Sequence, residues 1–382
     1  MEQDSFTEIT NQSWLSRIGG AIKNIFLGLI LFLIAFPLLF WNEGRAVKRH
    51  KTLNKGENIV ISISNNQVDS ANEGALIHIN GLATTEKILN DPVFNVSENA
   101  IQLLRSVEMY QWDEEKSSKT EKKVGGGTET KTTYSYKKVW ESSVINSNNF
   151  KKLSGHENPN QIPYESKKFF ADNVTLGAFQ LPQSLISKIT GFSPVNIDAS
   201  APLPVLPSGE IQRTETGYYL GKDINNPEIG DMRITFKVIK PANVSIVARQ
   251  VKDSFEPYES SQGGSIELLS MGILSSDAMF KKAQQSNKML TWLIRLGGFI
   301  LMFAGLSMVF SLLSVLADVI PLLGNIVAAG KNIIAFLTAG ILSCITIAIA
   351  WIIYRPLIGT ILLAAAILFG LTVSKKLRAA KK

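Results

Sequence analysis

Residues 24–42 have the sequence NIFLGLILFLIAFPLLFWN, a run of 19 residues without a charge between Lys23 and Glu43. An α-helix rises about 1.5 Å per residue, so roughly 20 apolar residues cross the ~30 Å hydrocarbon core of a bilayer. Such a run has to be helical in lipid, because its backbone polar groups must be satisfied within the segment. This stretch therefore predicts a membrane-spanning helix and decides the class of protein.

Similar runs fill the C-terminal part of the chain. Uncharged stretches of 22, 23 and 19 residues lie between Arg295 and Asp318, between Lys331 and Arg355, and between Arg355 and Lys375. Because its apolar core is longer than that of a signal peptide and no small-residue cleavage site follows, the first run indicates an uncleaved signal anchor. The sequence therefore predicts four transmembrane helices, at residues 24–42, 290–317, 332–354 and 356–374.

Residues 43–289 have the polarity of an ordinary water-facing domain. Apolar side chains alternate with polar ones from Met232 to Val238, and more weakly at 75–79 and 244–248, which is typical of strands with one buried face. Residues 107–112 and 133–140 predict a β-hairpin with a long flexible tip around Gly125–Gly127, and helices are expected at 99–107 and 182–189. The expected fold is an α+β membrane protein with a large β-rich domain inserted between the first and second spans.

The distribution of basic residues predicts an orientation. The tail, residues 375–382, has five Lys or Arg, and Arg17 and Lys23 precede the first span. Under the positive-inside rule, the tail and the N-terminal segment 1–23 are expected in the cytoplasm and residues 43–289 on the other side. The basic residues of 45–51 oppose this orientation. The tail contains no aromatic residue, so we expect it at a membrane surface and expect no nucleic-acid partner.

Seven residues at the ends of the spans are candidates for structural or interface roles. Glu43 and Arg45 follow the first span directly, and we expect them to dock the domain against the membrane helices. Arg355, between Tyr354 and Pro356, is expected to cap the turn between the third and fourth spans. Residues 318–331 are too few to cross a bilayer and contain Pro321, so they predict an interfacial or re-entrant connection. For Asp318 we favour a helix-end carboxylate at the water interface over an ion or proton site.

The sequence contains little that indicates chemistry. Its three histidines form no metal-binding pattern with one another or with Cys344, and no nucleophile elbow or dinucleotide fingerprint is present. His156, next to Glu157, is the most site-like histidine, although such pairs are common in loops. We therefore expect neither an enzyme nor a bound cofactor or metal.

Several short motifs, in order along nearly the whole chain, resemble the transmembrane protein 43 (LUMA) family. They comprise Asn42-Glu43-Gly44-Arg45-Ala46-Val47, Val107-Glu108-Met109, Tyr134-Ser135-Tyr136, Ile145-Asn146-Ser147-Asn148-Asn149-Phe150, Gly155-His156 with Asn158-Pro159, Gly230-Asp231, Val247-Ala248-Arg249-Gln250 and Tyr354-Arg355-Pro356.

The resemblance implies four spans, cytoplasmic or nucleoplasmic termini and a luminal domain. It also implies a self-associating scaffold, hence a homo-oligomer, that organises other membrane proteins within the bilayer. The membrane would be the bacterial inner membrane in a prokaryote, and the endoplasmic reticulum or inner nuclear membrane in a eukaryote. The family has no established catalytic residues to transfer. Two alternatives stay open: an oligomeric channel or transporter, and a lipid-binding protein that uses the soluble domain.

Overall fold

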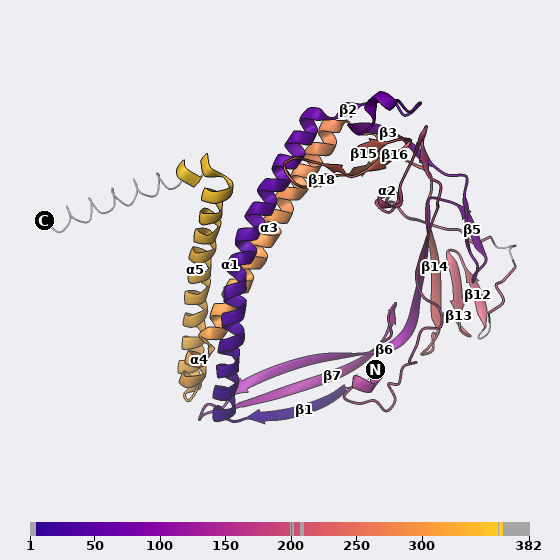
Figure 1. The fold of residues 1–382 in the computed structure, drawn as a ribbon. Helices are drawn as coiled ribbons and strands as arrows, with labels where there is room; N and C mark the ends of the chain where they lie inside the picture. Colours follow the sequence, from indigo (N-terminus) through magenta and orange to yellow (C-terminus); the bar gives the residue numbers. More distant parts are fainter. Residues whose placement is uncertain (1–4, 199, 201, 207–209, 358, 362–382) are drawn as a thin grey trace.

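The computed structural model describes residues 5–361 except 199, 201, 207–209 and 358. Four helices form the membrane-embedded part: α1 (Trp14–Ile59), α3 (Ser276–Val309), α4 (Ser311–Ala317) and α5 (Pro321–Tyr354). Figure 1 shows α1 and α3 side by side over much of their length, with α5 alongside them. The β-rich region lies opposite and meets the helices at both ends of α1.

Within the described residues, three helical segments are long and apolar enough to cross a membrane: Trp14–Ile59, Ser276–Ala317 and Gly324–Tyr354. The chain is thus an integral membrane protein, and its described residues contain one such helix near the N-terminus and two in the C-terminal part. The predicted first span lies inside a helix of 46 residues. Ser13 caps this helix by accepting a hydrogen bond from the Ser16 N–H, and Ser275 caps α3 in the same way.

The C-terminal helices differ from the expected arrangement. Most of the predicted connection 318–331 belongs to α5, which begins at Pro321. A proline is tolerated in the first turn of a helix because its missing N–H costs no hydrogen bond there. Pro321 therefore begins a helix instead of interrupting one. Most of the predicted fourth span, 356–374, and the tail 375–382 lie outside the described residues.

The β-rich region contains two main sheets, each counted within the part of the chain that the structure describes. The eight-stranded sheet has the order β1 (Ser5–Gln12), β7 (Thr128–Glu141), β6 (Gln102–Lys122), β14 (Met232–Ile239), β13 (Gly217–Leu220), β12 (Ile211–Thr214), with β8 (Lys167–Phe170) on β6 and β11 (Ser193–Pro194) on β14. The seven-stranded sheet has the order β10 (Phe179–Gln180), β9 (Thr175–Leu176), β3 (Leu76–Thr84), β15 (Ala242–Val251), β16 (Ser254–Glu256), with β19 (Leu268–Met271) on β15 and β2 (Ile61–Ser62) on β3.

Short elements complete this region. Two further antiparallel pairs are β4 (Ile88–Asp91) with β5 (Val96–Asn99), and β17 (Tyr258–Glu259) with β18 (Ser265–Ile266). The one-turn helix α2 (Gln183–Ile186) follows Pro182, within the segment expected to be helical. Residues 70–72 and 147–149 form single 3₁₀ turns.

Two apolar cores hold the β-rich region together and attach it to the helices. The larger core is built from the inner faces of both sheets and includes Phe94, Leu103 and Phe236, all fully buried. A smaller core joins Leu53 of α1 and Phe280 of α3 to strand residues such as Val247. Burying an aromatic or aliphatic side chain contributes about 1.5–3 kcal/mol, so the smaller core fixes the upper ends of α1 and α3 to the seven-stranded sheet.

The hairpin of β6 and β7 is longer and more regular than predicted. The two strands pair continuously from Met109 with Glu141 to Lys122 with Thr128, so only residues 123–127 form the turn. The expected flexible tip is therefore a ladder, stabilised by cross-strand pairs of β-branched residues such as Thr120 and Thr130. The predicted helix at 99–107 is wrong, because residues 102–107 belong to β6, where they pair with β14.

The N-terminal segment also differs from expectation. The distribution of basic residues predicted that residues 1–23 lie across the membrane from residues 43–289. In the structure, Ser5–Gln12 instead pairs with β7 along its entire length. Across this pairing the Thr7 and Thr133 hydroxyls lie 3.3 Å apart. Strand β1 and the hairpin therefore reach the end of α1 that is opposite to the smaller core (Figure 1).

Candidate functional site

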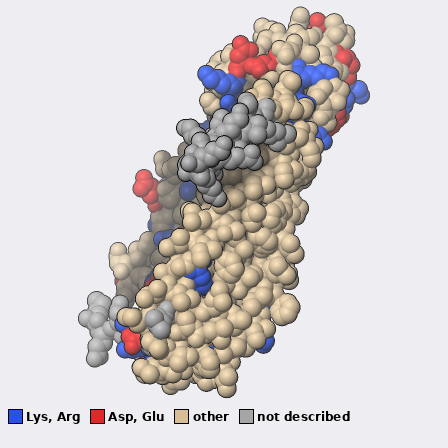
Figure 2. Space-filling view, turned by 90° about the vertical axis from the view of Figure 1, so that its left-hand side faces the viewer, with Lys and Arg blue, Asp and Glu red and all other residues tan. Residues whose placement is uncertain are grey.

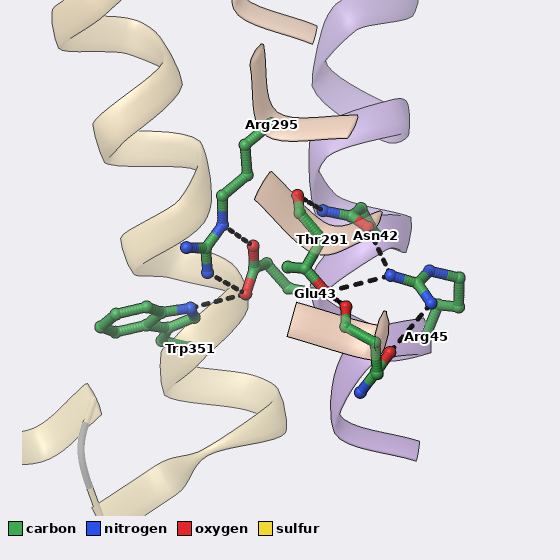
Figure 3. Close-up of polar contacts among 7 residues, drawn as sticks. Asn42, Glu43, Arg45, Thr291, Arg295 and Trp351 are labelled. Carbon is green, nitrogen blue, oxygen red and sulfur yellow. Dashed lines mark hydrogen bonds and ion pairs between the residues drawn. The ribbon is translucent and has the colours of Figure 1, made fainter. Parts of the chain in front are cut away.

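Glu43 is the centre of a buried polar cluster that joins three helices. Its carboxylate is completely buried and accepts two hydrogen bonds from Arg295 of α3, at 2.7 and 2.9 Å. The indole N–H of Trp351 in α5 donates a third, at 2.7 Å, as Figure 3 shows. A bidentate arginine–carboxylate pair fixes both position and angle, so this contact sets how α1, α3 and α5 lie relative to one another.

Four more residues extend the cluster along the α1–α3 contact. Arg45 donates to the side chains of Asn42, Thr291 and Asn287, each at 3.0 to 3.1 Å. Asn42 donates to the Thr291 carbonyl and Asn287 donates to the Ala46 carbonyl, both at 3.0 Å. We name these residues the Glu43 cluster: Asn42, Glu43, Arg45, Asn287, Thr291, Arg295 and Trp351.

Aromatic side chains surround the Glu43 cluster at one level of the bundle. The Arg295 guanidinium lies 4.7 Å from the ring centre of Trp292 and 5.6 Å from that of Trp351. Trp41 and Trp292 are 57% and 67% exposed, although both are large and apolar. Exposed tryptophans at one level are typical of the boundary between hydrocarbon and headgroups, which places the Glu43 cluster at that boundary.

A second buried cluster lies at the other end of α1. Asp318, the C-cap residue of α4, is 1% exposed and forms ion pairs with Arg17 of α1 and with Lys122 at the end of β6, the latter at 2.6 Å. Arg17 also donates to the Gly126 carbonyl in the hairpin turn. The Trp14 indole N–H donates to the Val315 carbonyl at 2.9 Å. We name Trp14, Arg17, Lys122, Gly126 and Asp318 the Asp318 cluster.

The Asp318 cluster leaves no room for larger side chains. A methyl group on Gly324 would lie 1.8 Å from the Asp318 carboxylate, and one on Gly126 would lie 2.4 Å from the Trp14 ring. The Gly125 N–H donates to the Val319 carbonyl at 3.1 Å, so the hairpin turn touches both α1 and the α4–α5 junction. These contacts hold the hairpin tip against the helix ends.

Comparisons with known proteins agree with this architecture. Residues 109–356 match the family described as Transmembrane protein 43. Transmembrane protein 43 of Homo sapiens is 35% identical over 380 residues, which cover 97% of this chain and 94% of the relative. The chain belongs to the transmembrane protein 43 family. The Rattus norvegicus protein is 35% identical, covering 94% of this chain and 92% of the relative, and the Drosophila melanogaster homologue is 30% identical, covering 88% and 90%. No solved structure matches.

The structure places each of the candidate residues. Glu43 and Arg45 bond to α3 and α5 rather than to the β-rich region, which differs from the docking role we expected. Arg355 is the C-cap residue of α5, and its guanidinium lies 5.7 Å from the Trp351 ring centre. The Tyr354 ring packs 5.3 Å from Phe40, and Pro356 accepts a hydrogen bond from the Thr360 hydroxyl. Asp318 is at a helix end, as expected, because it is the C-cap residue of α4, and its side chain is buried.

Two partners of these residues were not predicted. In the sequence, Arg295 marked only the edge of an apolar run. A buried arginine needs a carboxylate partner, however, and Glu43 is the acidic residue at the end of the first apolar run. That argument alone points to the pair. Lys122 carries no comparable signal, because its position depends on the exact register of a 21-residue strand.

The buried titratable groups outside these clusters have structural partners. The His156 ring stacks on Tyr136 at 3.9 Å and meets Trp112 edge-on at 4.7 Å. Asp91 forms a bidentate pair with Arg105 at 2.8 and 2.9 Å. Among the described residues, no three His, Cys, Asp or Glu side chains lie close enough together to hold a metal ion. In this transmembrane protein 43 homologue, polar side chains serve mainly to join segments.

Proposed function

We propose that the protein is a non-enzymatic membrane scaffold that self-associates and positions other membrane proteins. The observation that carries the proposal is the double attachment of the β-rich region to the helices. The smaller core holds one end of α1, and the Asp318 cluster with β1 holds the other. A domain fixed at two separate points keeps its orientation relative to the bundle, which is what a scaffold requires.

An open apolar groove between α3 and α5 supports self-association. It has a volume of about 500 Å³, and Leu296 and Phe299 of α3 form one wall. On α5, Gly340, Cys344 and Ala348 line it at four-residue spacing. Small residues at that spacing let a second helix approach closely in a membrane. Figure 2, which views the molecule from the side on which α5 lies in Figure 1, shows a broad area of uncharged residues with few charged side chains.

The two buried carboxylates of the helices favour a scaffold over a channel. Glu43 and Arg295 neutralise each other, and Asp318 is shared between Arg17 and Lys122. An ion pathway needs polar groups that are accessible to the ion. We infer the compartments from the resemblance alone: the endoplasmic reticulum or inner nuclear membrane in a eukaryotic cell, and the inner membrane in a bacterium.

Cys344 provides a direct test, because it is exposed, lies in the groove and is the single cysteine of the chain. If two copies meet at the groove, a short bismaleimide added to membranes yields a covalent dimer. The dimer disappears in a Cys344→Ser variant, and a bulky Gly340→Leu variant reduces it. Native mass spectrometry of the purified protein gives the stoichiometry. A monomer by both measurements contradicts self-association.

A further inference from the structure

The part of α1 that follows Trp41 is rich in positively charged residues. Arg45, Lys48, Arg49 and Lys51 follow Glu43 within eight residues, and Glu43 is already occupied by Arg295. In the described part of the chain, Lys48 and Lys51 have no carboxylate within ion-pair distance. Both side chains are exposed. Their charges are therefore available to a ligand.

These lysines line a cavity of about 620 Å³ between α1, α5 and the turn that joins β17 to β18. Arg45 also lines the cavity, together with Gln262 from the turn. Trp41, Ile353 and Tyr354 form its apolar part. Among the described residues that line it there is no carboxylate, so this lining has three positive charges and one amide. In the same part of the chain, the buried Arg45 Nε–H has no hydrogen-bond partner.

The cavity lies where phospholipid headgroups lie. Trp41 is part of the exposed tryptophan level described above, and Lys48 and Lys51 are two to three turns closer to the β-rich region. On the side of the cavity that is away from the β-rich region, exposed apolar residues continue along α1 and α5. They are Ile30, Ile34 and Trp41 on α1, and Ile345, Ile349 and Ile353 on α5.

We propose that this cavity binds the headgroup of an anionic phospholipid, with the phosphate accepting hydrogen bonds from Lys48 and Lys51 and the Arg45 guanidinium adding a nearby positive charge. The acyl chains then lie on the isoleucine stripes of α1 and α5. A basic pocket at a helix–membrane boundary suits such a headgroup, and each lysine near the surface strengthens binding about fivefold. A free phosphate would find the same cations but would leave the apolar part of the cavity and the stripes uncovered.

The test measures lipid binding to the purified full-length protein by native mass spectrometry. Phosphatidylglycerol and phosphatidylcholine with identical chains are titrated separately. We expect phosphatidylglycerol to bind more tightly, and the Lys48→Gln, Lys51→Gln double variant to lose about 25-fold in affinity, at roughly fivefold for each lysine. The matched control, Lys119→Gln with Lys123→Gln in the hairpin, removes the same charge from exposed positions and should bind like the wild type.

Three results overturn the proposal. They are equal affinity of the double variant and wild type, equal affinity for the two lipids, and complete displacement of phosphatidylglycerol by equimolar inorganic phosphate, which would indicate a site for a free anion. If the double variant does not fold, the wild type still decides the matter. Its preference for phosphatidylglycerol should fall as salt rises, because ions screen exposed charges, and a preference that does not respond to salt contradicts the assignment.

Discussion

Buried ion pairs hold α1 at two levels, at Arg17 near its start and at Glu43 beyond its midpoint, but the pairs are built differently. The Glu43 cluster draws its residues from the helices alone, with Arg295 and Trp351 facing one carboxylate. The Asp318 cluster combines a helix start, a hairpin end and a helix junction, from residues up to 301 positions apart. The first cluster therefore sets the geometry of the bundle, whereas the second closes the connection between the bundle and the β-rich region.

The largest expected effect concerns the pairing of β1 with β7, which connects the β-rich region to the start of α1. If this pairing does not form in a membrane, the Asp318 cluster does not join the β-rich region to the helices. Thr7 and Thr133 lie opposite each other in β1 and β7. Thr7→Cys with Thr133→Cys, in a Cys344→Ser background, should form a disulfide in nearly all molecules when membranes are oxidised mildly. Thr7→Cys with Ser117→Cys, which are not paired, serves as the control. Absence of the disulfide would favour the orientation that the basic residues predict, with residues 1–23 across the membrane from the hairpin.

Removal of Glu43 should have the largest effect on stability. Glu43→Ala leaves Arg295, whose side chain is 13% exposed, without its carboxylate. An uncompensated buried charge costs about 3–5 kcal/mol, so the helices should separate in thermal unfolding followed by circular dichroism. Glu43→Leu with Arg295→Leu removes both charges and should recover most of the loss. A double variant as unstable as Glu43→Ala would contradict this account.

Loss of Asp318 should act locally. Asp318→Ala leaves the Arg17 guanidinium with the Gly126 carbonyl as a partner and leaves the Lys122 side chain 23% exposed, so we expect a cost of about 1–3 kcal/mol. Hydrogen exchange should increase in residues 120–130 and in β1, while α3 keeps its protection. Asp318→Asn retains the shape and some hydrogen bonds, and should show a smaller increase. Equal loss of protection in α3 would show that the two clusters are not independent.

The glycines midway between the clusters test how closely α1 and α3 must pack. A methyl group on Gly305 would lie 2.6 Å from the Gly28 carbonyl oxygen, whereas one on Gly297 meets nothing within 4 Å. Gly305→Ala should therefore cost about 1–3 kcal/mol, and Gly297→Ala should be neutral or slightly stabilising. Thermal unfolding of the two variants in parallel provides the measurement, and equal midpoints would show that the contact is not tight.

The smallest expected effect is the pH dependence of β1. Hydrogen bonding by Lys151, at 2.8 Å, holds the pKa of Glu8 below its ordinary value of 4.5. A lowered pKa means that the pair stabilises β1 above about pH 4.5 and that this stabilisation is lost as pH falls through the lowered pKa. Pepsin cleavage near Phe6 should therefore increase as the pH falls through that lowered pKa. A Glu8→Gln variant should lack that increase, and an identical pH profile would contradict the role of the pair.

The sequence predicted elements whose residues carry a local pattern. The apolar runs gave α1, α3 and α5, and the alternation at Met232–Val238 gave β14. The prediction of a helix at 99–107 was wrong because residues 102–107 belong to β6 and pair with β14. Tertiary pairing here overrides local preference. The Asp318 cluster could not be predicted, since it depends on the length of the hairpin. The Glu43–Arg295 pair could have been, from the cost of burying either charge alone.

The distance along the chain between the members of the Asp318 cluster affects the timing of synthesis. Lys122 is 196 residues before Asp318. At about 5–20 residues per second, a ribosome needs roughly 10–40 s to make that interval. For that time Arg17 and Lys122 exist without the carboxylate that they share, and the hairpin tip has no helix junction to bind. A nascent chain is therefore vulnerable to proteases and wrong partners until α4 emerges, and factors that shield the hairpin would act in this interval.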